Sequence, residues 1–320
     1  MKYPVYTVDA FTSVPFAGNQ AAVFLCDKSL GDDLYKKIAA EFNFSETAYP
    51  VPLNEGETFA TASEFRLRWF TPAVEAPLCG HATLATTHVL INELGNPSPI
   101  FKFHTLSGVL TASKNGDAVE LNFPAAKLEL MKVEDIELDA VRNEIYPEGT
   151  VPTYLSKLIR ATVPEPIAIR SVYYTTPDKR FLIEVDEKLT CDEFLGITPN
   201  ISEMLRILPD KKALQGVMLT MAPTKPTEQG FVDEKGVPYD YGLRFFAPWS
   251  GINEDPACGS AQCSIAPFWS KITGKQSFFA YQPCLNRGGQ FKVTVSDGDE
   301  GQNVSIVGSS KTTVRGEMEF

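Results

Sequence analysis

Two short segments, far apart in the chain, each place a cysteine directly before a glycine. They read "EAPLCGHATLA" from Glu75 and "EDPACGSAQCS" from Glu254. The first amide N–H groups of a helix lack partners within the helix, and the macrodipole adds partial positive charge at that end. If both segments begin helices that face each other across a cleft, they would hold a small carboxylate and stabilise negative charge developing on it.

The candidate binding groups are the backbone amides of Gly80 and Gly259, with Cys79 and Cys258 beside them. Glycine at these positions also permits a tight turn between a strand and a helix, so each motif alone is equally consistent with a structural role. The recurrence of the motif favours a ligand site. His81 follows Gly80, and the positive potential of a helix start should lower its pKa and favour the neutral ring.

Glu46, in "FNFSETAYP", is the candidate general base. Its neighbours are largely apolar, and desolvation raises the pKa of a carboxyl group toward the range that suits a base. From this stretch alone, a solvated glutamate at a turn between a helix and a strand is the favoured interpretation. Asp255, in "NEDPACGSA", is a candidate capping group for the second helix.

Two other histidines and the cysteine spacing give no metal signature. His88 and His104 are assigned to structure because no acidic or thiol partner accompanies them at a recognisable spacing. Cys258 and Cys263 are five residues apart, which is not a zinc pattern. Neither half contains a glycine fingerprint for a nucleotide. The sequence therefore predicts no metal and no cofactor.

The elements that must position these residues follow from hydrophobic periodicity. Alternating apolar residues predict strands, and residues 32–42 and 82–94 predict helices, the second ended by Gly95. After an acidic, helix-prone passage between about 125 and 166, the strand signals resume and a helix is expected at "ISEMLRIL". The predicted strands are "YPVYTVDAF", "AAVFLCD", "ETAYPVP", "EFRLRWF", "SGVLTASK", "AVELNFP", "AIRSVYYTT", "RFLIEVD" and "GVMLTMAP".

The order of these elements repeats. "RWFTPAVEAPLCGHA" from Arg68 aligns with "RFFAPWSGINEDPACGSA" from Arg244, with three extra residues in the second copy. Each copy passes from a strand through a proline turn and Cys-Gly into a helix. We therefore expect two similar lobes, 1–127 and 128–320, related by an approximate two-fold, with a last strand that can return to the first lobe. Pro267 should kink or shorten the second helix.

Length and composition limit the class of protein. With 320 residues, 43% of them hydrophobic and 22% charged, the chain can form two compact globular units. The net charge of -11 disfavours nucleic acid and anionic lipid as partners. No apolar run approaches the ~20 residues of a membrane span, and no leader pattern opens the chain, so a cytoplasmic protein with six reduced cysteines is expected.

Four separated motifs together resemble the PhzF family of phenazine biosynthesis proteins: "DAFTSVPFAGNQAAVF", "FSETAYP", "RWFTPAVEAPLCGHATLA" and "FFAPWSGINEDPACGSA". The resemblance covers nearly the whole chain. It implies the diaminopimelate epimerase-like α+β fold, in which two pseudo-symmetric lobes each wrap a curved, mostly antiparallel sheet around a central helix. The family's characterised member is a cofactor-free isomerase of trans-2,3-dihydro-3-hydroxyanthranilate, and a homodimer fits the family.

Carried over to this chain, the resemblance makes Glu46 the acid/base, with His81, Asp255 and Ser260 completing the site. Gly80 and Gly259 would offer backbone amides to a small carboxylate metabolite, beside Cys79 and Cys258. Three functions follow. The first is a cofactor-independent isomerase that uses Glu46. The second is an epimerase that uses Cys79 and Cys258 as two thiol bases, although "CGHA" lacks the asparagine-glycine that follows the first epimerase cysteine. The third is a family member that binds a metabolite or protein without turnover.

Overall fold

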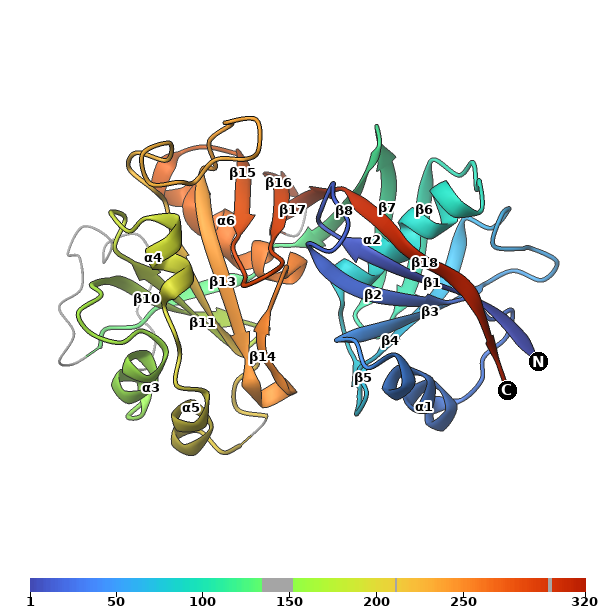
Figure 1. Ribbon diagram of the computed structural model, residues 1–320, viewed down its shortest axis with the longest axis horizontal. Helices are drawn as coiled ribbons and strands as arrows, with labels where there is room; N and C mark the ends of the chain where they lie inside the picture. Colours follow the sequence, from blue (N-terminus) through green and yellow to red (C-terminus); the bar gives the residue numbers. More distant parts are fainter. Residues whose placement is uncertain (134–151, 211, 299–300) are drawn as a thin grey trace.

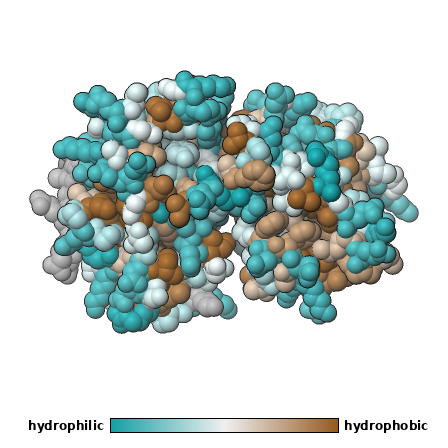
Figure 2. Space-filling model, viewed as in Figure 1, coloured by the Kyte–Doolittle hydropathy of each residue, from teal (hydrophilic) through white to brown (hydrophobic). Residues whose placement is uncertain are grey.

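The computed structural model describes residues 1–133, 152–210, 212–298 and 301–320. The described chain forms two bodies that lie side by side (Figure 1). One mixed sheet of eighteen strands runs through both, with a few helices, so the fold is α+β. In the space-filling view the two bodies meet at a narrow waist, and hydrophilic residues cover most of the outline (Figure 2).

The first body contains strands from both ends of the chain. Its strands are β1 Lys2–Ala10, β2 Asn19–Phe24, β3 Glu46–Pro52, β4 Glu64–Phe70, β5 Glu75–Ala76, β6 Ile100–Thr105, β7 Gly108–Asn115, β8 Ala118–Pro124 and β18 Ser310–Glu319. The C-terminal strand β18 pairs antiparallel with β1. From there the pairing continues through β2, β3, β4, β6 and β7 to β8.

The second body contains the remaining strands. These are β9 Lys127–Leu130, β10 Ile169–Thr176, β11 Arg180–Val185, β12 Gly216–Met221, β13 Tyr241–Ala247, β14 Ile252–Asp255, β15 Ser277–Gln282, β16 Gly289–Gly298 and β17 Gly301–Gly308. Pairing runs from β9 through β10, β11, β12, β13, β15 and β16 to β17. Antiparallel pairing of β17 with β8 joins the two bodies into one sheet.

The succession of pairings is the same in both bodies. In the first, β1–β2 is antiparallel, β2–β3 parallel, β3–β4 antiparallel and β4–β6 parallel. In the second, β10–β11, β11–β12, β12–β13 and β13–β15 follow the same alternation. The short strands β5 and β14 pair with β4 and β13, directly before each Cys-Gly. This correspondence makes β3 the counterpart of β12.

The helices occupy corresponding places in the two bodies. Helix α1 (Asp32–Phe42) connects β2 to β3, and helices α4 (Cys191–Gly196) and α5 (Ile201–Ile207) connect β11 to β12. Helix α2 (Gly80–His88) and helix α6 (Gly259–Thr273) are the central helices, and α3 (Leu155–Thr162) lies on the second body (Figure 1). The 3-10 turn η3 covers Pro248–Ser250.

The central helix α2 is buried along its whole length. All nine of its residues are buried, so it has no polar face. Its threonine hydroxyls hydrogen-bond carbonyl oxygens one turn earlier, as Thr83 does to Cys79 at 2.6 Å and Thr86 to Ala82 at 2.7 Å. The three threonines of α2 therefore lie in the core with their hydroxyls paired, while the strands around them supply apolar contacts.

Most predicted elements are confirmed, including the helix at residues 32–42. The helix expected at 82–94 differs. It begins earlier, at Gly80, and its last turn is a π-helix, η1 (Val89–Glu93), in which the amide of Leu94 donates to the carbonyl of Val89. The predicted passage at 125–166 contains β9 and α3, and its residues 134–151 lie outside the described part of the chain.

Pro267 does not shorten the second central helix. Helix α6 continues from Gly259 to Thr273, with Gly274 as a left-handed C-cap. A proline removes the N–H that would bond the carbonyl four residues earlier, here that of Cys263. The amide of Ala126 donates to this carbonyl at 2.8 Å instead. The segment that crosses between the bodies thus replaces the missing hydrogen bond, which is why the expected shortening is wrong.

The six cysteines are free thiols. Among the described residues, no helix has the length and apolar character needed to cross a membrane.

Candidate active site

The starts of the two central helices lie against each other where the two bodies meet. A Cβ atom added to Gly80 would lie 3.5 Å from the Cα atom of Gly259. A Cβ atom on Gly259 would lie 2.8 Å from the Phe11 ring, so only glycine fits there without a shift. Cys79 and Cys258 are the extended N-cap residues of the two helices. The two Cys-Gly motifs are therefore in contact, rather than separated by an open cleft as expected.

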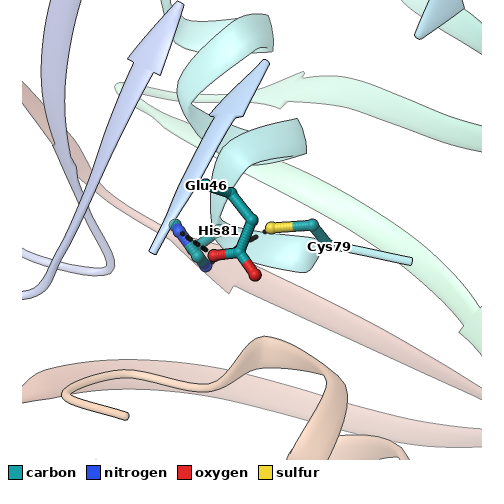
Figure 3. Close-up of side chains that lie close together, drawn as sticks. All are labelled: Glu46, Cys79 and His81. Atoms are coloured by element: carbon teal, nitrogen blue, oxygen red, sulfur yellow. Dashed lines mark hydrogen bonds and ion pairs between the residues drawn. The ribbon is translucent and has the colours of Figure 1, made fainter. Parts of the chain in front are cut away.

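Glu46 and His81 meet at the start of α2. Glu46 is the first residue of β3, and its side chain is 12% exposed. Its Oε2 atom lies 3.4 Å from Nε2 of His81 but has no hydrogen-bond partner. Figure 3 shows the carboxylate, the imidazole and the thiol of Cys79 close together, with the thiol 3.5 Å from Nδ1. A buried carboxyl group with an unpaired oxygen is free to accept a proton.

Asn19 links the two bodies at this point. Its Nδ2 atom lies 3.2 Å from Nδ1 of His81 and donates to Oδ1 of Asp255 at 3.0 Å and to the carbonyl of Ala257 at 3.1 Å. The amide has only two N–H bonds, and Asp255 and Ala257 accept both, so either ring nitrogen of His81 can carry the proton of the neutral imidazole. Nε2 faces Glu46 and the hydroxyl of Ser45, which is 3.3 Å away.

The carboxyl groups of the site have raised pKa values. Burial, together with the negative charge of Asp255, raises the pKa of Glu46 to about 7. Burial also raises the pKa of Asp255 to about 6. The hydrogen bond from the amide of Ala257 and the charge of Arg180 act in the opposite direction, but burial is the larger effect. The pKa of His81 falls to about 3 because burial disfavours the charged ring. His81 is therefore neutral, as the sequence predicts, with burial as the main cause.

The two thiols do not have the low pKa that a helix start alone would give. Burial raises the pKa of Cys79 well above its ordinary value and that of Cys258 to about 12. Nearby carboxylates, Glu46 at Cys79 and Asp255 at Cys258, act in the same direction. Desolvation and negative neighbours therefore outweigh the macrodipole at both thiols.

Asp255 is at the site but does not cap helix α6. The N-cap residue of α6 is Cys258, and Oδ1 of Asp255 accepts from the amide of Ala257 at 2.9 Å, ahead of the helix. This is a local turn contact of the kind that aspartate favours. Ser260, the second residue of α6, has its hydroxyl 3.4 Å from the thiol of Cys258 and accepts from Nη2 of Arg180 at 3.0 Å.

A cavity of about 440 Å³ opens beside this cluster, between loops of both bodies. It reaches Asn19 and Ser45, which contact His81, and Pro256, which follows Asp255. Its lining comes from residues 19–20, 43–45, 71–73, 250–252, 254 and 256. A small molecule can therefore approach the cluster from the seam between the bodies.

One group of side chains has the composition of a metal site. Donor atoms of Glu46, Cys79 and His81 lie within 4.8 Å of one another, and all three residue types bind zinc in proteins. The carboxylate lies 3.4 Å from Nε2 of the ring, and the thiol lies 3.5 Å from Nδ1 (Figure 3). The expectation of no metal stays a prediction.

The other sequence candidates have structural contacts. His88 lies 3.1 Å from the hydroxyl of Thr312, and His104 lies 3.0 Å from a carboxylate oxygen of Glu64. Asn19, Ser45 and Arg180 are site residues that sequence reasoning missed. Two signals were available, since Asn19 and Ser45 lie inside the family motifs "DAFTSVPFAGNQAAVF" and "FSETAYP".

A buried carboxyl group beside a neutral imidazole, on a mixed sheet with two central helices, forms a site suited to proton transfer. The comparisons then give the family. The model of the family described as phenazine biosynthesis-like protein matches residues 8–316, and the chain belongs to this family. The resemblance found in the sequence is thereby confirmed.

Three similar proteins span this chain almost completely. A phenazine biosynthesis-like domain-containing protein of Bos taurus is 33% identical, with 99% of both chains covered. A protein of Halalkalibacterium halodurans described as an uncharacterized isomerase is 34% identical, again with 99% of both covered. The crystal structure of a PhzF family protein of Enterococcus faecalis matches with a TM-score of 0.76 and 29% identity, with 100% of both chains covered.

Proposed function

We propose that this protein is a cofactor-independent isomerase that moves a proton between carbons of a small carboxylate substrate, with Glu46 as the acid/base. The observation that carries the proposal is the state of Glu46: a buried carboxyl group with a pKa of about 7 and an unpaired Oε2 atom. A general base works best when its pKa lies near the operating pH, because it is then partly ionised yet still basic.

In the proposed reaction, the Glu46 carboxylate removes a proton from a carbon made acidic by a neighbouring carboxylate or conjugated system. The electron pair of the broken C–H bond delocalises, the proton on Glu46 exchanges with solvent, and Glu46 then protonates another carbon. The reaction consumes no oxidant or reductant. Nε2 of His81 faces Glu46 at 3.4 Å, so in the tautomer with the proton on Nε2 the ring would stabilise the carboxylate between the two transfers. Asp255 and Ser260 complete the site from the second body.

We infer that the two bodies are lobes related by an approximate two-fold, so that α2 and α6 present equivalent starts to one ligand. The repeated succession of strand pairings supports this inference. The amides of Gly80 and Gly259 would then stabilise negative charge on the substrate from both sides. The boundary at residue 127, the homodimer and a cytoplasmic location stay predictions.

The two-thiol epimerase has weaker support. Such a mechanism needs one thiolate to remove a proton while a thiol on the opposite face supplies another. Burial and neighbouring carboxylates raise the pKa of both Cys79 and Cys258, which disfavours the thiolate form at neutral pH. Near pH 7 a substantial fraction of Glu46 is ionised and can accept a proton, whereas the thiols stay protonated.

Proton exchange with solvent tests the proposal. Wild-type protein, Glu46→Gln and a Cys79→Ala, Cys258→Ala double variant are incubated in D₂O with trans-2,3-dihydro-3-hydroxyanthranilate and a panel of small carboxylic acids. Mass spectrometry then measures deuterium uptake. We expect Glu46→Gln to slow uptake ~10²–10⁴-fold, because the amide keeps the shape of the side chain but loses the base. The double-cysteine variant should stay within ~10-fold of wild type.

An exposed glutamate, Glu55, provides the matched control, and Glu55→Gln should exchange at the wild-type rate. Exchange should also survive dialysis against a chelator, since no step uses a metal. If the double-cysteine variant is inactive while Glu46→Gln remains active, the epimerase replaces the isomerase. If wild-type protein binds acids of the panel but exchanges none, the chain is a binding member of the family without turnover.

A further inference from the structure

Arg180 is a buried cation at the site with free hydrogen-bond donors. It is the first residue of β11, and its side chain is 9% exposed. Nη2 donates to the hydroxyl of Ser260 at 3.0 Å, but Nε and Nη1 have no hydrogen-bond partner. The nearest ion-pair contact is Oδ2 of Asp178, 3.9 Å from Nη1 and beyond hydrogen-bonding distance. The guanidinium is therefore held in place without being saturated.

Such a group is costly to the folded protein. A guanidinium stays charged at any pH at which the protein is folded, so burial cannot neutralise it. A buried charged donor without an acceptor retains most of its desolvation cost. The ring of Phe245, 4.8 Å from the guanidinium carbon, compensates part of that cost through its π face but accepts no N–H from the free edge. An anionic ligand would satisfy the unpaired donors.

The correspondence between the two bodies shows which residue of the second body occupies the place of Glu46. In the parallel pair β2–β3, Ala21 lies opposite Glu46, and in the corresponding pair β11–β12, Arg180 lies opposite Gly216. Gly216 therefore occupies the place of Glu46. A Cβ atom on Gly216 would lie 2.4 Å from the Phe245 ring, so no second carboxylate fits there.

The two central helices also differ at their second residues. His81 and Ser260 are the second residues of α2 and α6. His81 contacts the carboxylate of Glu46, whereas Ser260 contacts the guanidinium of Arg180. The two equivalent halves of the site thus have opposite character: one provides a proton acceptor and the other a fixed positive charge.

We propose that Arg180, together with Ser260 and the start of helix α6, binds the carboxylate group of the substrate. This inference rests on the proposed function and names its substrate class: a small acid whose ionised carboxylate is anchored in the second body while a nearby carbon faces Glu46. The planar N–H fork of arginine matches a planar carboxylate. A dianionic phosphate is disfavoured, because Glu46 and Asp255 already bring two carboxyl groups to the site.

Entry follows from the geometry of the seam. The cavity of about 440 Å³ is lined in part by Asn19, Ser45 and Pro256, which border the cluster, whereas Arg180 is buried and is not part of the lining. We expect a ligand to approach the guanidinium from this cavity.

Binding of acid–amide pairs tests the proposal. Benzoate and benzamide, anthranilate and anthranilamide, and proline and prolinamide are titrated into wild-type protein, Arg180→Gln and Arg206→Gln, with thermal shift and calorimetry as readouts. Arg206 is the matched control because its side chain is 71% exposed. At least one acid should bind wild type more tightly than its amide does. Arg180→Gln should bind this acid about 10- to 100-fold more weakly than wild type does, and it should bind the amide with unchanged affinity.

Two further measurements separate ligand binding from a structural role. Without ligand, Arg180→Gln should melt at or above the wild-type temperature, since it removes an unpaired buried charge. Arg180→Lys should keep part of the acid preference, because charge remains while the fork is lost. Wild-type protein that prefers no acid over its amide, or Arg180→Gln that binds acids as wild type does, overturns the proposal. Acid binding by Glu46→Gln should persist, so failure of the base and failure of the anchor are distinguishable.

Discussion

Glu46 combines two properties that rarely occur together in one carboxyl group. It is buried in the site, which raises its pKa to about 7, and Oε2 keeps no hydrogen bond that would stabilise its charge. The neutral ring of His81 beside it offers a proton without adding a second charge. The same environment that makes Glu46 a base therefore destabilises the folded protein once Glu46 ionises.

This coupling predicts a pH dependence of stability that Glu46→Gln removes. The pKa of Glu46 is raised from 4.5 to about 7 on folding. The contribution of protonated Glu46 to the free energy of unfolding is therefore complete below pH 4.5 and is lost as the pH rises through 7. The loss is about 3 kcal/mol, because each pH unit between the two pKa values is worth about 1.4 kcal/mol. Urea unfolding at pH 4.5 and pH 8 should show that wild-type protein loses free energy of unfolding between these pH values relative to Glu46→Gln. The difference between the two proteins should change by about this amount. Parallel changes in both proteins would contradict the assignment.

At the scale of single residues, the sequence indicates the chemistry but not the connections. The apolar neighbours of Glu46 point to the raised pKa, but the solvated glutamate that this stretch alone favours is wrong, because the side chain is buried. Asn19, by contrast, contacts His81 and Asp255 across separations of 62 and 236 residues, and Arg180 contacts Ser260 across 80. Local patterns contain no information about contacts at such separations. These residues therefore become recognisable only when the strands bring them together.

At the scale of elements, the two central helices are constrained most strongly where they begin. A Cβ atom at position 259 would lie 2.8 Å from Cζ and 3.2 Å from Cε2 of Phe11, a fully buried side chain. At position 80 the nearest atoms would lie 3.5–3.7 Å away, which is ordinary contact. The two glycines therefore serve different purposes: Gly259 gives room to the core, and Gly80 gives room to the facing helix start.

We expect Gly259→Ala and Gly80→Ala to separate these purposes. Overpacking against Phe11 should lower the free energy of unfolding of Gly259→Ala by about 1–3 kcal/mol. Gly80→Ala should unfold like wild type but exchange substrate protons more slowly, because its methyl group enters the space between the helix starts. Denaturant titration together with deuterium uptake provides both readouts. Equal destabilisation by the two substitutions would mean that Gly80 is also a packing residue.

The elements themselves follow largely from the sequence. Helix α1 has its predicted bounds because Leu34, Ile38 and Phe42 share one face and acidic residues begin the first turn. The π-helical turn after α2 was not predicted, since buried helices lack the polar face from which periodicity is read. The continuation of α6 past Pro267 depends on the amide of Ala126, a contact between distant segments. The local sequence therefore determines where a helix ends only where no tertiary contact supplies the hydrogen bonds that the local sequence lacks.

At the scale of the whole molecule, three contacts in the described part of the chain join the two bodies besides the hydrogen bonds of Asn19. Strand β17 pairs with β8, the helix starts meet, and the loop before β16 contacts the loop between β1 and β2. In this last contact Arg287 donates to Asp9 at 2.7 Å and to the carbonyls of Ala17 and Gly18 at 2.7 and 2.8 Å. Asp9 is 1% exposed, so its carboxylate depends on this partner and on the amide of Phe16.

Arg287→Ala should therefore weaken the junction between the bodies. Removal of one partner from a buried ion pair leaves the other charge uncompensated, and the expected loss is about 3 kcal/mol in the free energy of unfolding. The control is Arg206→Ala, whose exposed pair with Glu203 should contribute nothing measurable.

Hydrogen exchange followed by mass spectrometry gives a second readout for Arg287→Ala. Relative to wild type, exchange should become faster in the loop between β1 and β2, which leads into Asn19, and change less in the distant helix α3. Substrate affinity should fall with it, because Asn19 holds His81 and Asp255 in register across the seam. Unchanged stability together with unchanged exchange in this loop would show that β8–β17 pairing and the helix contact suffice to hold the two bodies together.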